Sequence, residues 1–284
     1  LSDLAPLHNP ANLVGYRAFA KALPHVRHVA VFDTAFHQSM PPEIYMYPIP
    51  YEYYTNFKVR RYGFHGTSHC YVSNRLAQIL DKDIKNLNII TCHLGNGASL
   101  AAIKGGKSVN TSMGFTPLAG VMMGTRSGDI DPAIINYIME KTGQSEADVL
   151  NVLNKKSGML GVSGISSDAR DIEGAIEEGN ARAKLTRDMY CNRVAARIGE
   201  YFVQLGHVDG IIFTGGLGEN DMLVRQGILQ NIEEAMGLKV DYELNLKVRG
   251  KEICLSKESS KVQVWIVPTN EELVIARDTF EIIK

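Results

Sequence analysis

The sequence predicts an α/β protein, because short strand-like segments alternate with amphipathic helical ones. The strand-like segments are rich in β-branched residues and are bounded by Gly, Pro, Asn or Asp, as strands usually are. We expect strands at residues 28–32, 87–92, 98–103, 209–214 and 262–267. The chain has 284 residues, of which 45% are hydrophobic. That is enough to bury a sizeable core, and the length suggests about two domains.

Capping signals predict the ends of two central helices. Asp131 is expected as an N-cap, with Pro132 as the first helical residue and Gly143 as the stop. Ser145 and Asp148 have the spacing of a capping box at the start of the next helix.

Two further helices and one loop complete the expected elements. Residues 181–206 have the pattern of a long amphipathic helix that ends at Gly206, and Asn270 is the expected N-cap of a last helix. The Pro- and Tyr-rich stretch 40–54 carries too many aromatic residues for a flexible tether. We expect it to pack as a loop over the sheet.

The charge balance and the cysteines limit the class of protein. Thirty basic residues face 31 acidic ones, a net charge of -1, so neither nucleic acid nor an anionic membrane is an expected partner. No apolar run approaches the roughly 20 residues that a membrane helix needs. The four cysteines form no CxxC pair, which predicts reduced thiols in a cytoplasmic protein. They are Cys70, Cys92, Cys191 and Cys254.

Two glycine-rich loops follow expected strands. Residues 93–99 (HLGNGAS) predict a hairpin whose small tip would let backbone N–H groups approach a phosphate. A plain hairpin turn explains them equally well, since Asn-Gly is a favoured turn pair. Residues 214–220 (TGGLGEN) precede a helix expected to start near Glu219, a position suited to nucleotide binding. This segment matches neither GxGxxG nor a Walker A loop, so a tight βα turn is the alternative.

A third loop, residues 124–129 (GTRSGD), places Arg126 between glycines. Its guanidinium could present a rigid set of donors to phosphate or carboxylate oxygens. The alternative is a surface arginine on a turn.

His65 and His69 have the spacing of metal ligands on one helical face. Gly66 resembles a helix start, however, so we expect His65 to precede the helix and to share no face with His69. No neighbouring Glu and no third ligand is evident, which disfavours zinc. The other histidines are expected to be hydrogen-bonded structural residues; of these we note His8, His25, His28, His37 and His207.

Carboxylates stand at two further places. Asp33 directly follows the first expected strand, where α/β enzymes often place catalytic groups, although it could equally cap the next segment. Glu271 and Glu272 fall in the first turn of the last helix. They could interact with the helix dipole, or hold magnesium directly or through water.

Together, and in this order, these segments resemble the acetate kinases, within the acetate and propionate kinase group. The matching segments run from residue 4 to residue 279. They are LAPLHNPAN, VAVFDTAFHQSMP, YGFHGTSHCYVS, IITCHLGNGAS, GKSVNTSMGFTPL, MMGTRSGDIDPA, KKSGMLGVSGISSDARDI, DGIIFTGGLGEN and VPTNEELVIARDT.

The resemblance implies the acetate and sugar kinase/Hsp70/actin fold, with two ribonuclease-H-like α/β domains around a nucleotide cleft. Residues 35–269 would form the C-terminal nucleotide-binding domain. Residues 1–34 would be a remnant of the N-terminal domain, completed by residues 270–284. The resemblance also implies the reversible reaction of ATP and acetate to ADP and acetyl phosphate, with Mg²⁺ or Mn²⁺, in a homodimer.

Site residues carry over by matching motif. The implied catalytic residues are Asp33, His65, Arg126 and His8. Of these, His65 and Arg126 would steady the transferring phosphoryl group. Glu271 resembles the metal ligand, and Leu7 and Pro117 resemble part of the acetate pocket. The implied ATP-binding residues are His93, Leu94, Gly95, Asn96, Gly97, Asp168, Ala169, Arg170, Gly216, Leu217, Gly218, Glu219 and Asn220.

The chain also departs from the family pattern. Family members carry a substantial stretch before LAPLHNP, so we expect this chain to be a fragment with an incomplete first domain and little activity alone. A propionate or short-chain acyl kinase, and an inactive nucleotide-binding fragment, are the alternatives. Asn110, Ala119 and Ala169 stand where the family usually has Asp, Glu and a bulkier residue.

Overall fold

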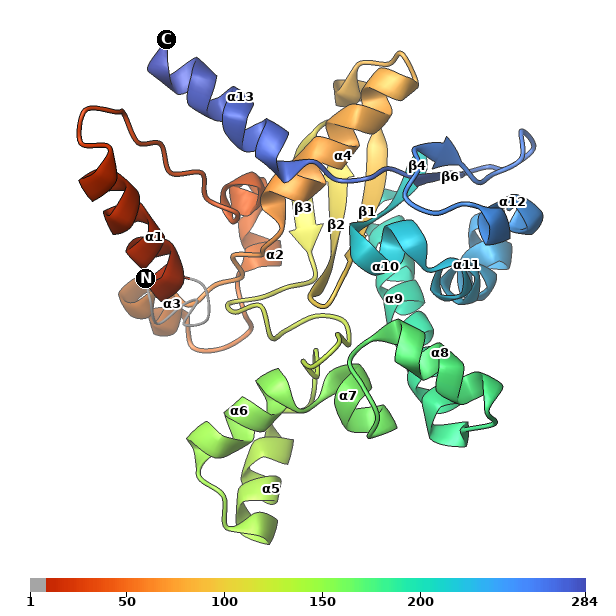
Figure 1. Cartoon of the computed structure of the whole chain (residues 1–284), viewed down its shortest axis with the longest axis horizontal. Helices are drawn as coiled ribbons and strands as arrows, with labels where there is room; N and C mark the ends of the chain where they lie inside the picture. The colour runs from red at the N-terminus through yellow and green to blue at the C-terminus, as the bar shows by residue number, and fades with distance from the viewer. Residues whose placement is uncertain (1–8) are drawn as a thin grey trace.

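A six-stranded mixed sheet forms the centre of the protein (Figure 1). The computed structural model describes residues 9–284. The strand order is β3-β2-β1-β4-β6-β5. The first three strands form an antiparallel meander, β4 is parallel to β1, and β6 is parallel to β4. The strands are β1 (Asn88–Leu94), β2 (Ala98–Lys104), β3 (Lys107–Thr111), β4 (Gly210–Thr214), β5 (Ile253–Cys254) and β6 (Gln263–Ile266).

Helices cover both faces of the sheet. On one face α9 (Ala181–Leu205) and α11 (Met222–Met236) enclose the larger hydrophobic core, and on the other α4 (Gly66–Ile79) lies over a smaller one. The other α-helices are α1 (Asn9–Ala22), α2 (Pro42–Tyr45), α3 (Tyr51–Phe57), α5 (Ala133–Thr142), α6 (Glu146–Lys155), α7 (Gly158–Ser163), α8 (Ala169–Glu177), α10 (Gly215–Asn220), α12 (Tyr242–Lys247) and α13 (Glu271–Ile283). Two short 3-10 helices are η1 (Ala35–Ser39) and η2 (Ile84–Asn86).

The two faces of strand β1 carry different kinds of side chain. Side chains of a strand point alternately to opposite faces. Ile90 and Cys92 therefore enter the larger core beneath α9, whereas Ile89 enters the core beneath α4. Thr91 and His93 share the face of Ile89 and form hydrogen bonds with side chains of α4. From Ile90 onward, one face of β1 is thus apolar, whereas the other becomes polar toward the carboxyl end of the strand.

Four of the five expected strands are confirmed, as β1, β2, β4 and β6. The prediction of a strand at residues 28–32 is wrong, because these residues pair with no strand in the described part of the chain. Phe32 is 61% exposed. An apolar β-branched run becomes a strand only where a neighbouring strand supplies backbone hydrogen-bond partners. The short strands β3 and β5 were not expected.

The predicted helix ends are mostly confirmed. Gly143 ends α5 in a left-handed conformation, and the capping box at Ser145 is present. Gly206 follows α9, and the Asn270 side chain caps α13 by accepting from the Leu273 N–H at 3.0 Å.

Three predicted boundaries are corrected. The N-cap of α5 is Pro132 rather than Asp131, although Asp131 still accepts the N–H of Ala133 at 2.9 Å. The stretch 40–54 is not a loop, because it contains α2 and the start of α3. Each of these helices follows a proline, whose fixed φ favours a helix start. The helix expected near Glu219 begins earlier, since α10 already contains the glycines of TGGLGEN.

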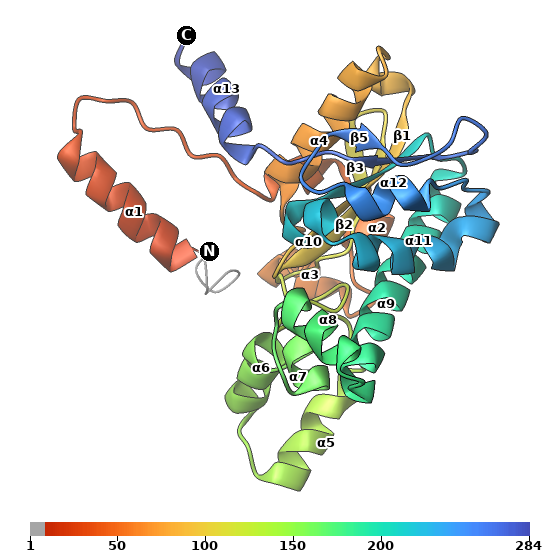
Figure 2. The same ribbon diagram turned by 45° about the vertical axis from the view of Figure 1, so that its right-hand side comes forward.

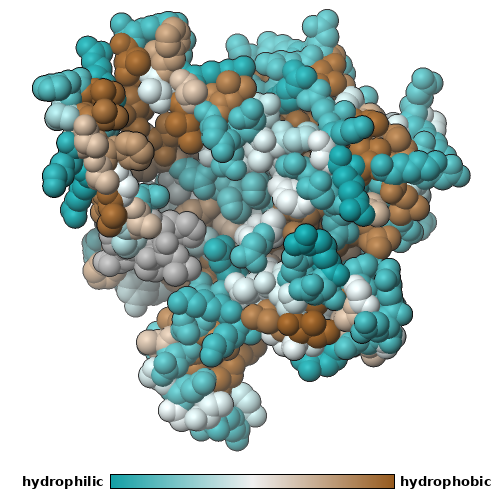
Figure 3. All heavy atoms as spheres, viewed as in Figure 1, coloured by the Kyte–Doolittle hydropathy of each residue, from teal (hydrophilic) through white to brown (hydrophobic). Residues whose placement is uncertain are grey.

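The two ends of the described chain stand away from the sheet. Figures 1 and 2 show α1 and α13 projecting from the body of the molecule. Several apolar side chains of α1 are exposed, among them Val14 (66%) and Phe19 (64%), and Figure 3 shows apolar atoms gathered in this region. All four cysteines are free thiols, as predicted. Among the described residues, no helix has the length and hydropathy needed to span a membrane.

Candidate active site

Asp33 is held at the N-terminus of α4. Its carboxylate accepts hydrogen bonds from the N–H of His65 and from the Thr67 hydroxyl at 2.9 Å, and its carbonyl accepts the Gly66 N–H at 2.9 Å. His65 adopts a left-handed conformation (φ 57°), and a Cβ on Gly66 would lie 2.2 Å from the Asp33 carbonyl oxygen. Gly66 is therefore required for this close approach, and Asp33 both caps α4 and fixes the backbone of His65.

The expected hairpin brings His65 and Arg126 together. Residues 93–99 connect β1 to β2, as predicted, with Leu94 opposite Ala98. A Cβ built on Gly97 would lie 3.3 Å from Nη1 of Arg126, 3.6 Å from Cε1 of His65 and 3.7 Å from its Nε2. The two side chains thus meet over Gly97, where the hairpin has no side chain to keep them away.

The loop that carries Arg126 is half-buried and tightly anchored. Nη1 of Arg126 donates to the carbonyl of Pro117 at 3.3 Å, so the implied acetate-pocket residue lies beside it. Burial lowers the pKa of Arg126, but a guanidinium stays protonated at any physiological pH. Gly124 donates its N–H to the Asn96 carbonyl at 3.1 Å, which joins this loop to the hairpin. The alternative of a surface arginine on a turn is therefore wrong.

The start of α7 also fixes this loop. The backbone N–H groups of Ser157, Met159 and Leu160 donate to the carbonyls of Thr125, Met123 and Gly124 at 2.9, 2.9 and 3.0 Å.

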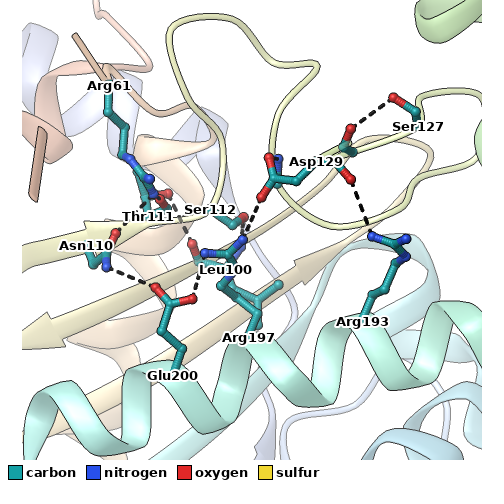
Figure 4. A network of polar contacts seen from close by, with 12 residues as sticks. Arg61, Leu100, Asn110, Thr111, Ser112, Ser127, Asp129, Arg193, Arg197 and Glu200 are labelled. Carbon is teal, nitrogen blue, oxygen red and sulfur yellow. Dashed lines mark hydrogen bonds and ion pairs between the residues drawn. The ribbon is translucent and has the colours of Figure 1, made fainter. Parts of the chain in front are cut away.

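A polar network attaches the same loop to α9 (Figure 4). Asp129 and Gly120 exchange two hydrogen bonds of 2.8 Å, and Arg197 of α9 donates to the Asp129 carboxylate at 2.8 Å. Asn110 of β3 belongs to the same region. It accepts from Arg61 at 3.2 Å and donates to Gln204 of α9 at 2.8 Å. An amide can both accept and donate, so asparagine satisfies these two partners at once.

Four histidines cluster behind the site. His65 stacks on His93 with ring centroids 4.2 Å apart, and the rings of His37 and His69 lie near by. Burial lowers the pKa of His37 and of His93 to about 4 in each case, and that of His69 well below its ordinary value. Both ring nitrogens of His37 form hydrogen bonds, with Ser108 and with the Phe64 carbonyl, so its expected structural role is confirmed.

The pair His65 and His69 does not form a zinc site. Both ring nitrogens of His69 lie at hydroxyl oxygens, and among the described residues no group of three His, Cys, Asp or Glu is placed to hold a metal ion. His65 precedes α4, as predicted.

Glu271 lies beside Asp33. The hydroxyl of Thr67 lies 2.9 Å from Oδ1 of Asp33 and 3.3 Å from Oε2 of Glu271. Burial, together with the charge of Asp33, raises the pKa of Glu271. Two carboxylates that share one hydroxyl gain from a nearby cation, and Mg²⁺ in phosphate sites commonly takes one or two protein carboxylates. The pair therefore fits a magnesium site.

The implied ATP-binding segments meet at this end of the sheet. A Cβ on Gly215 would lie 2.9 Å from the Leu94 carbonyl oxygen, and a Cβ on Gly124 would lie 3.3 Å from that of Ser167. The loops at 93–97, 124–126, 167–170 and 215–220 are thus neighbours. Three residues of these segments form hydrogen bonds or ion pairs within the protein itself. Glu219 accepts the N–H groups of Gly215 and Thr269 at 2.8 and 3.2 Å, whereas Asp168 caps α8 and pairs with Arg170.

Two implied residues, His8 and Leu7, lie outside the described residues. The remaining ones are brought together, but sequence reasoning missed the hydroxyls that connect them. Ser99 lies 2.8 Å from both Nδ1 of His65 and Nε2 of His69, and Ser68 lies 2.8 Å from Nδ1 of His93. The strand sequences contained a signal for these hydroxyls. Thr91 and Ser99 interrupt otherwise apolar strands, and a polar residue in a buried strand needs a hydrogen-bond partner.

Gly158 offers a test of how the Arg126 loop is fixed. A Cβ there would lie 2.1 and 2.7 Å from the carbonyl oxygens of Met123 and Arg126, at φ +60°. Gly158→Ala should therefore destabilise the protein by roughly 3 kcal/mol or more, read as the free energy of unfolding in urea. Gly143→Ala is the matched control, because φ is +70° but nothing lies within 4 Å. The free energy of unfolding of Gly143→Ala should fall by only about 1–2 kcal/mol. If both variants lose the same free energy, the backbone around Gly158 can move away from the added methyl group.

Comparison with known proteins agrees with this geometry. The sequence model of the Acetokinase family matches residues 1–277. The acetate kinase of Geobacillus kaustophilus is 60% identical over 282 residues, which are 99% of this chain and 71% of that relative. The acetate kinase of Bacillus subtilis is 58% identical over 284 residues, with coverage of 100% and 71%.

Two solved kinase structures are also similar to this chain. The crystal structure of Porphyromonas gingivalis acetate kinase has a TM-score of 0.95 and 52% identity, covering 100% of this chain and 71% of that one. A propionate kinase from Francisella tularensis has a TM-score of 0.92 and 42% identity, with coverage of 98% and 70%. The α/β class is confirmed, as is the fold implied by the resemblance. The chain belongs to the acetokinase family.

Proposed function

We propose that the protein is an acetate kinase, which reversibly transfers the γ-phosphoryl group of ATP to acetate and yields acetyl phosphate and ADP. One observation carries this proposal: His65 and Arg126, from two separate segments of the chain, meet at Gly97 on the hairpin tip, and Asp33 from a third segment holds the backbone of His65. The identity to acetate kinases supports it.

In the forward direction, a carboxylate oxygen of acetate forms a bond to the γ-phosphorus. The bond from that phosphorus to the β,γ-bridging oxygen breaks, and ADP leaves. A carboxylate is already ionised at neutral pH, so the site needs no strong base. It must instead bring two anions together and stabilise the charge that spreads over the equatorial phosphoryl oxygens.

The chain supplies that stabilisation from Arg126 and His65. The half-buried guanidinium of Arg126 offers a positive charge with fixed donors, in surroundings that strengthen its electrostatic effect. His65 lies beside it and can donate a hydrogen bond to an equatorial oxygen. Asp33 holds the backbone of His65 in place and contributes negative charge next to Glu271.

Glu271 would hold Mg²⁺, or Mn²⁺ in its place, beside Asp33. When bound, the cation would neutralise phosphate charge and polarise a phosphoryl oxygen. The shared Thr67 hydroxyl and the raised pKa of Glu271 support this assignment.

The Glu271 assignment predicts a metal-dependent defect. Glu271→Gln should raise the Mg²⁺ concentration for half-maximal activity by roughly tenfold or more, because a neutral amide attracts the cation less strongly. Glu272→Gln is the control, since its side chain lies in the same helical turn but is exposed. An unchanged Mg²⁺ dependence in the Glu271 variant would remove this residue from the metal site.

ATP is proposed to bind along the neighbouring loops 93–97, 168–170 and 216–220. We assign residues 35–269 to the nucleotide-binding domain, and residues 1–34 with 270–284 to the other domain. Homodimerisation and a cytoplasmic location, which the family resemblance implies, stay predictions.

The test traps acyl phosphate as its hydroxamate, with Mg-ATP and acetate, propionate or butyrate in parallel. Among the three acids, acetate should give the most product, and propionate as the best acceptor would identify a propionate kinase instead. Binding of ATP without any acyl phosphate would favour the alternative of a nucleotide-binding module.

A further inference from the structure

A chain of buried hydrogen bonds runs from β1 and β2 to the His65 ring beneath α4. Thr91 Oγ1 lies 2.7 Å from Nδ1 of His69, and Nε2 of His69 lies 2.8 Å from Ser99 Oγ. Ser99 Oγ in turn lies 2.8 Å from Nδ1 of His65. Thr91, Ser99 and His69 are all fully buried. Each contact is short enough to be a hydrogen bond between well-placed groups.

When Ser99 donates its single proton to one of its two ring neighbours, two arrangements of this chain are possible. A neutral imidazole has one donor and one acceptor nitrogen, and a hydroxyl has one proton to donate. His69 is neutral, since it is completely buried among hydroxyls and the rings of His37, His65 and His93. It therefore accepts from one of its two hydroxyl neighbours and donates to the other.

In the first arrangement every hydroxyl donates toward His65. Thr91 donates to Nδ1 of His69, Nε2–H of His69 donates to Ser99, and Ser99 donates to Nδ1 of His65. All three contacts are then used at 2.7–2.8 Å. His65 must carry its proton on Nε2.

In the second arrangement every bond is reversed. Nδ1–H of His65 donates to Ser99, Ser99 donates to His69, and His69 donates to Thr91. The Thr91 hydroxyl must then donate elsewhere, and its other acceptor, the carbonyl of Ala101, is 3.5 Å away. A hydrogen bond of that length contributes little, so the first arrangement is the more stable one.

We propose that His69 is a positioning residue, which acts through Ser99 so that the neutral form of His65 carries its proton on Nε2. This nitrogen belongs to the ring edge that faces Gly97 and Arg126. His65 then donates to a phosphoryl oxygen without first having to gain a proton. The inference rests on the proposed function only where turnover is measured, because the tautomer itself is a property of the protein alone.

The closing experiment measures the tautomer and the kinetics separately. Two-bond ¹H–¹⁵N correlation spectra of ¹⁵N-histidine-labelled protein identify the protonated ring nitrogen, and His65→Gln assigns its signals. In the unaltered protein the proton should reside on Nε2. A predominant proton on Nδ1 would overturn the proposal, whatever the enzymatic activity.

Two variants interrupt the chain. Ser99→Ala removes the last donor, so His65 should populate both tautomers and kcat should fall roughly 10- to 100-fold with little change in KM. Thr91→Val is close in shape and touches neither Ser99 nor His65, yet it removes the hydroxyl that favours one direction. It should also give a mixture of tautomers, with a smaller loss of kcat. An unchanged His65 tautomer in both variants would contradict the proposal.

Ser108→Ala is the matched control. Ser108 is fully buried and lies 2.8 Å from Nδ1 of His37, so this variant also loses one buried Ser–His hydrogen bond. The other ring nitrogen of His37 bonds to the backbone carbonyl of Phe64. This bond is not one of the side-chain hydrogen bonds that reach the His65 ring. The His65 tautomer and kcat should stay unchanged. If Ser108→Ala lowers kcat as much as Ser99→Ala, the effect is general destabilisation and the proposal fails. If all variants lack turnover while the tautomer behaves as expected, the proposed function fails and this inference stands.

Discussion

Replacing Arg126 with alanine should lower kcat by about 10²- to 10³-fold, with little change in the KM for ATP. The half-buried guanidinium shares the Gly97 tip with His65 and is held by the Pro117 carbonyl. In that position its charge would act mainly on the phosphoryl group in the transition state. Steady-state kinetics with varied ATP and acetate separate the two parameters.

Arg126→Lys serves as the control for charge. Lysine keeps the positive charge but loses the planar set of donors, so its kcat should lie between that of the unaltered protein and that of the alanine variant. A higher KM for ATP with an unchanged kcat in Arg126→Ala would mean that Arg126 binds only the ground state.

Acidification should destabilise the fold well above the pH at which carboxylates titrate. Burial lowers the pKa of His37 and of His93 to about 4, whereas an unfolded histidine has a pKa of about 6.5. Between these values the unfolded chain binds more protons than the folded one, so the free energy of unfolding falls as the pH falls. At pH 5 each of the two histidines should cost about 2 kcal/mol relative to pH 7.5.

Urea unfolding at pH 7.5, 6.5, 5.5 and 5.0 measures this loss. His69 adds to it, because burial also lowers its pKa. A combined loss of about 4 kcal/mol or more is a large part of the 5–15 kcal/mol typical of a folded domain. In His93→Gln, the free energy of unfolding should depend less steeply on pH, by about one bound proton. If the free energy of unfolding of the unaltered protein does not change between pH 7.5 and 5.0, the buried histidines are not neutral in the folded state.

The sequence predicted those elements whose signal is local. The capping residues Ser145 and Asn270 and the stops Gly143 and Gly206 act within one helical turn, so they could be recognised without any knowledge of tertiary structure. The strand at residues 28–32 could not be judged in this way, because a strand depends on a partner that is distant in sequence.

The same limit applies to the candidate site. Asp33, His65 and Arg126 could be named from their segments, but the contacts around them come from other parts of the fold. Thr67 connects Asp33 to Glu271 across more than 200 positions of sequence, and Ser99 reaches His65 only because β2 folds back along β1. The family resemblance implies roles for individual residues, whereas the hydroxyls between them come together only in the folded chain.

The two faces of β1 have different environments, and this difference limits which insertions and deletions the strand can tolerate. Its apolar face fills the core beneath α9, while Thr91 and His93 on the other face reach the histidine cluster. Inserting or deleting one residue within Asn88–Leu94 would exchange the two faces from that point on. Hydroxyl and imidazole groups would enter the apolar core, and aliphatic side chains would enter the histidine cluster. Length changes along evolutionary lineages should therefore be absent from this strand and should accumulate in loops such as that between α5 and α6.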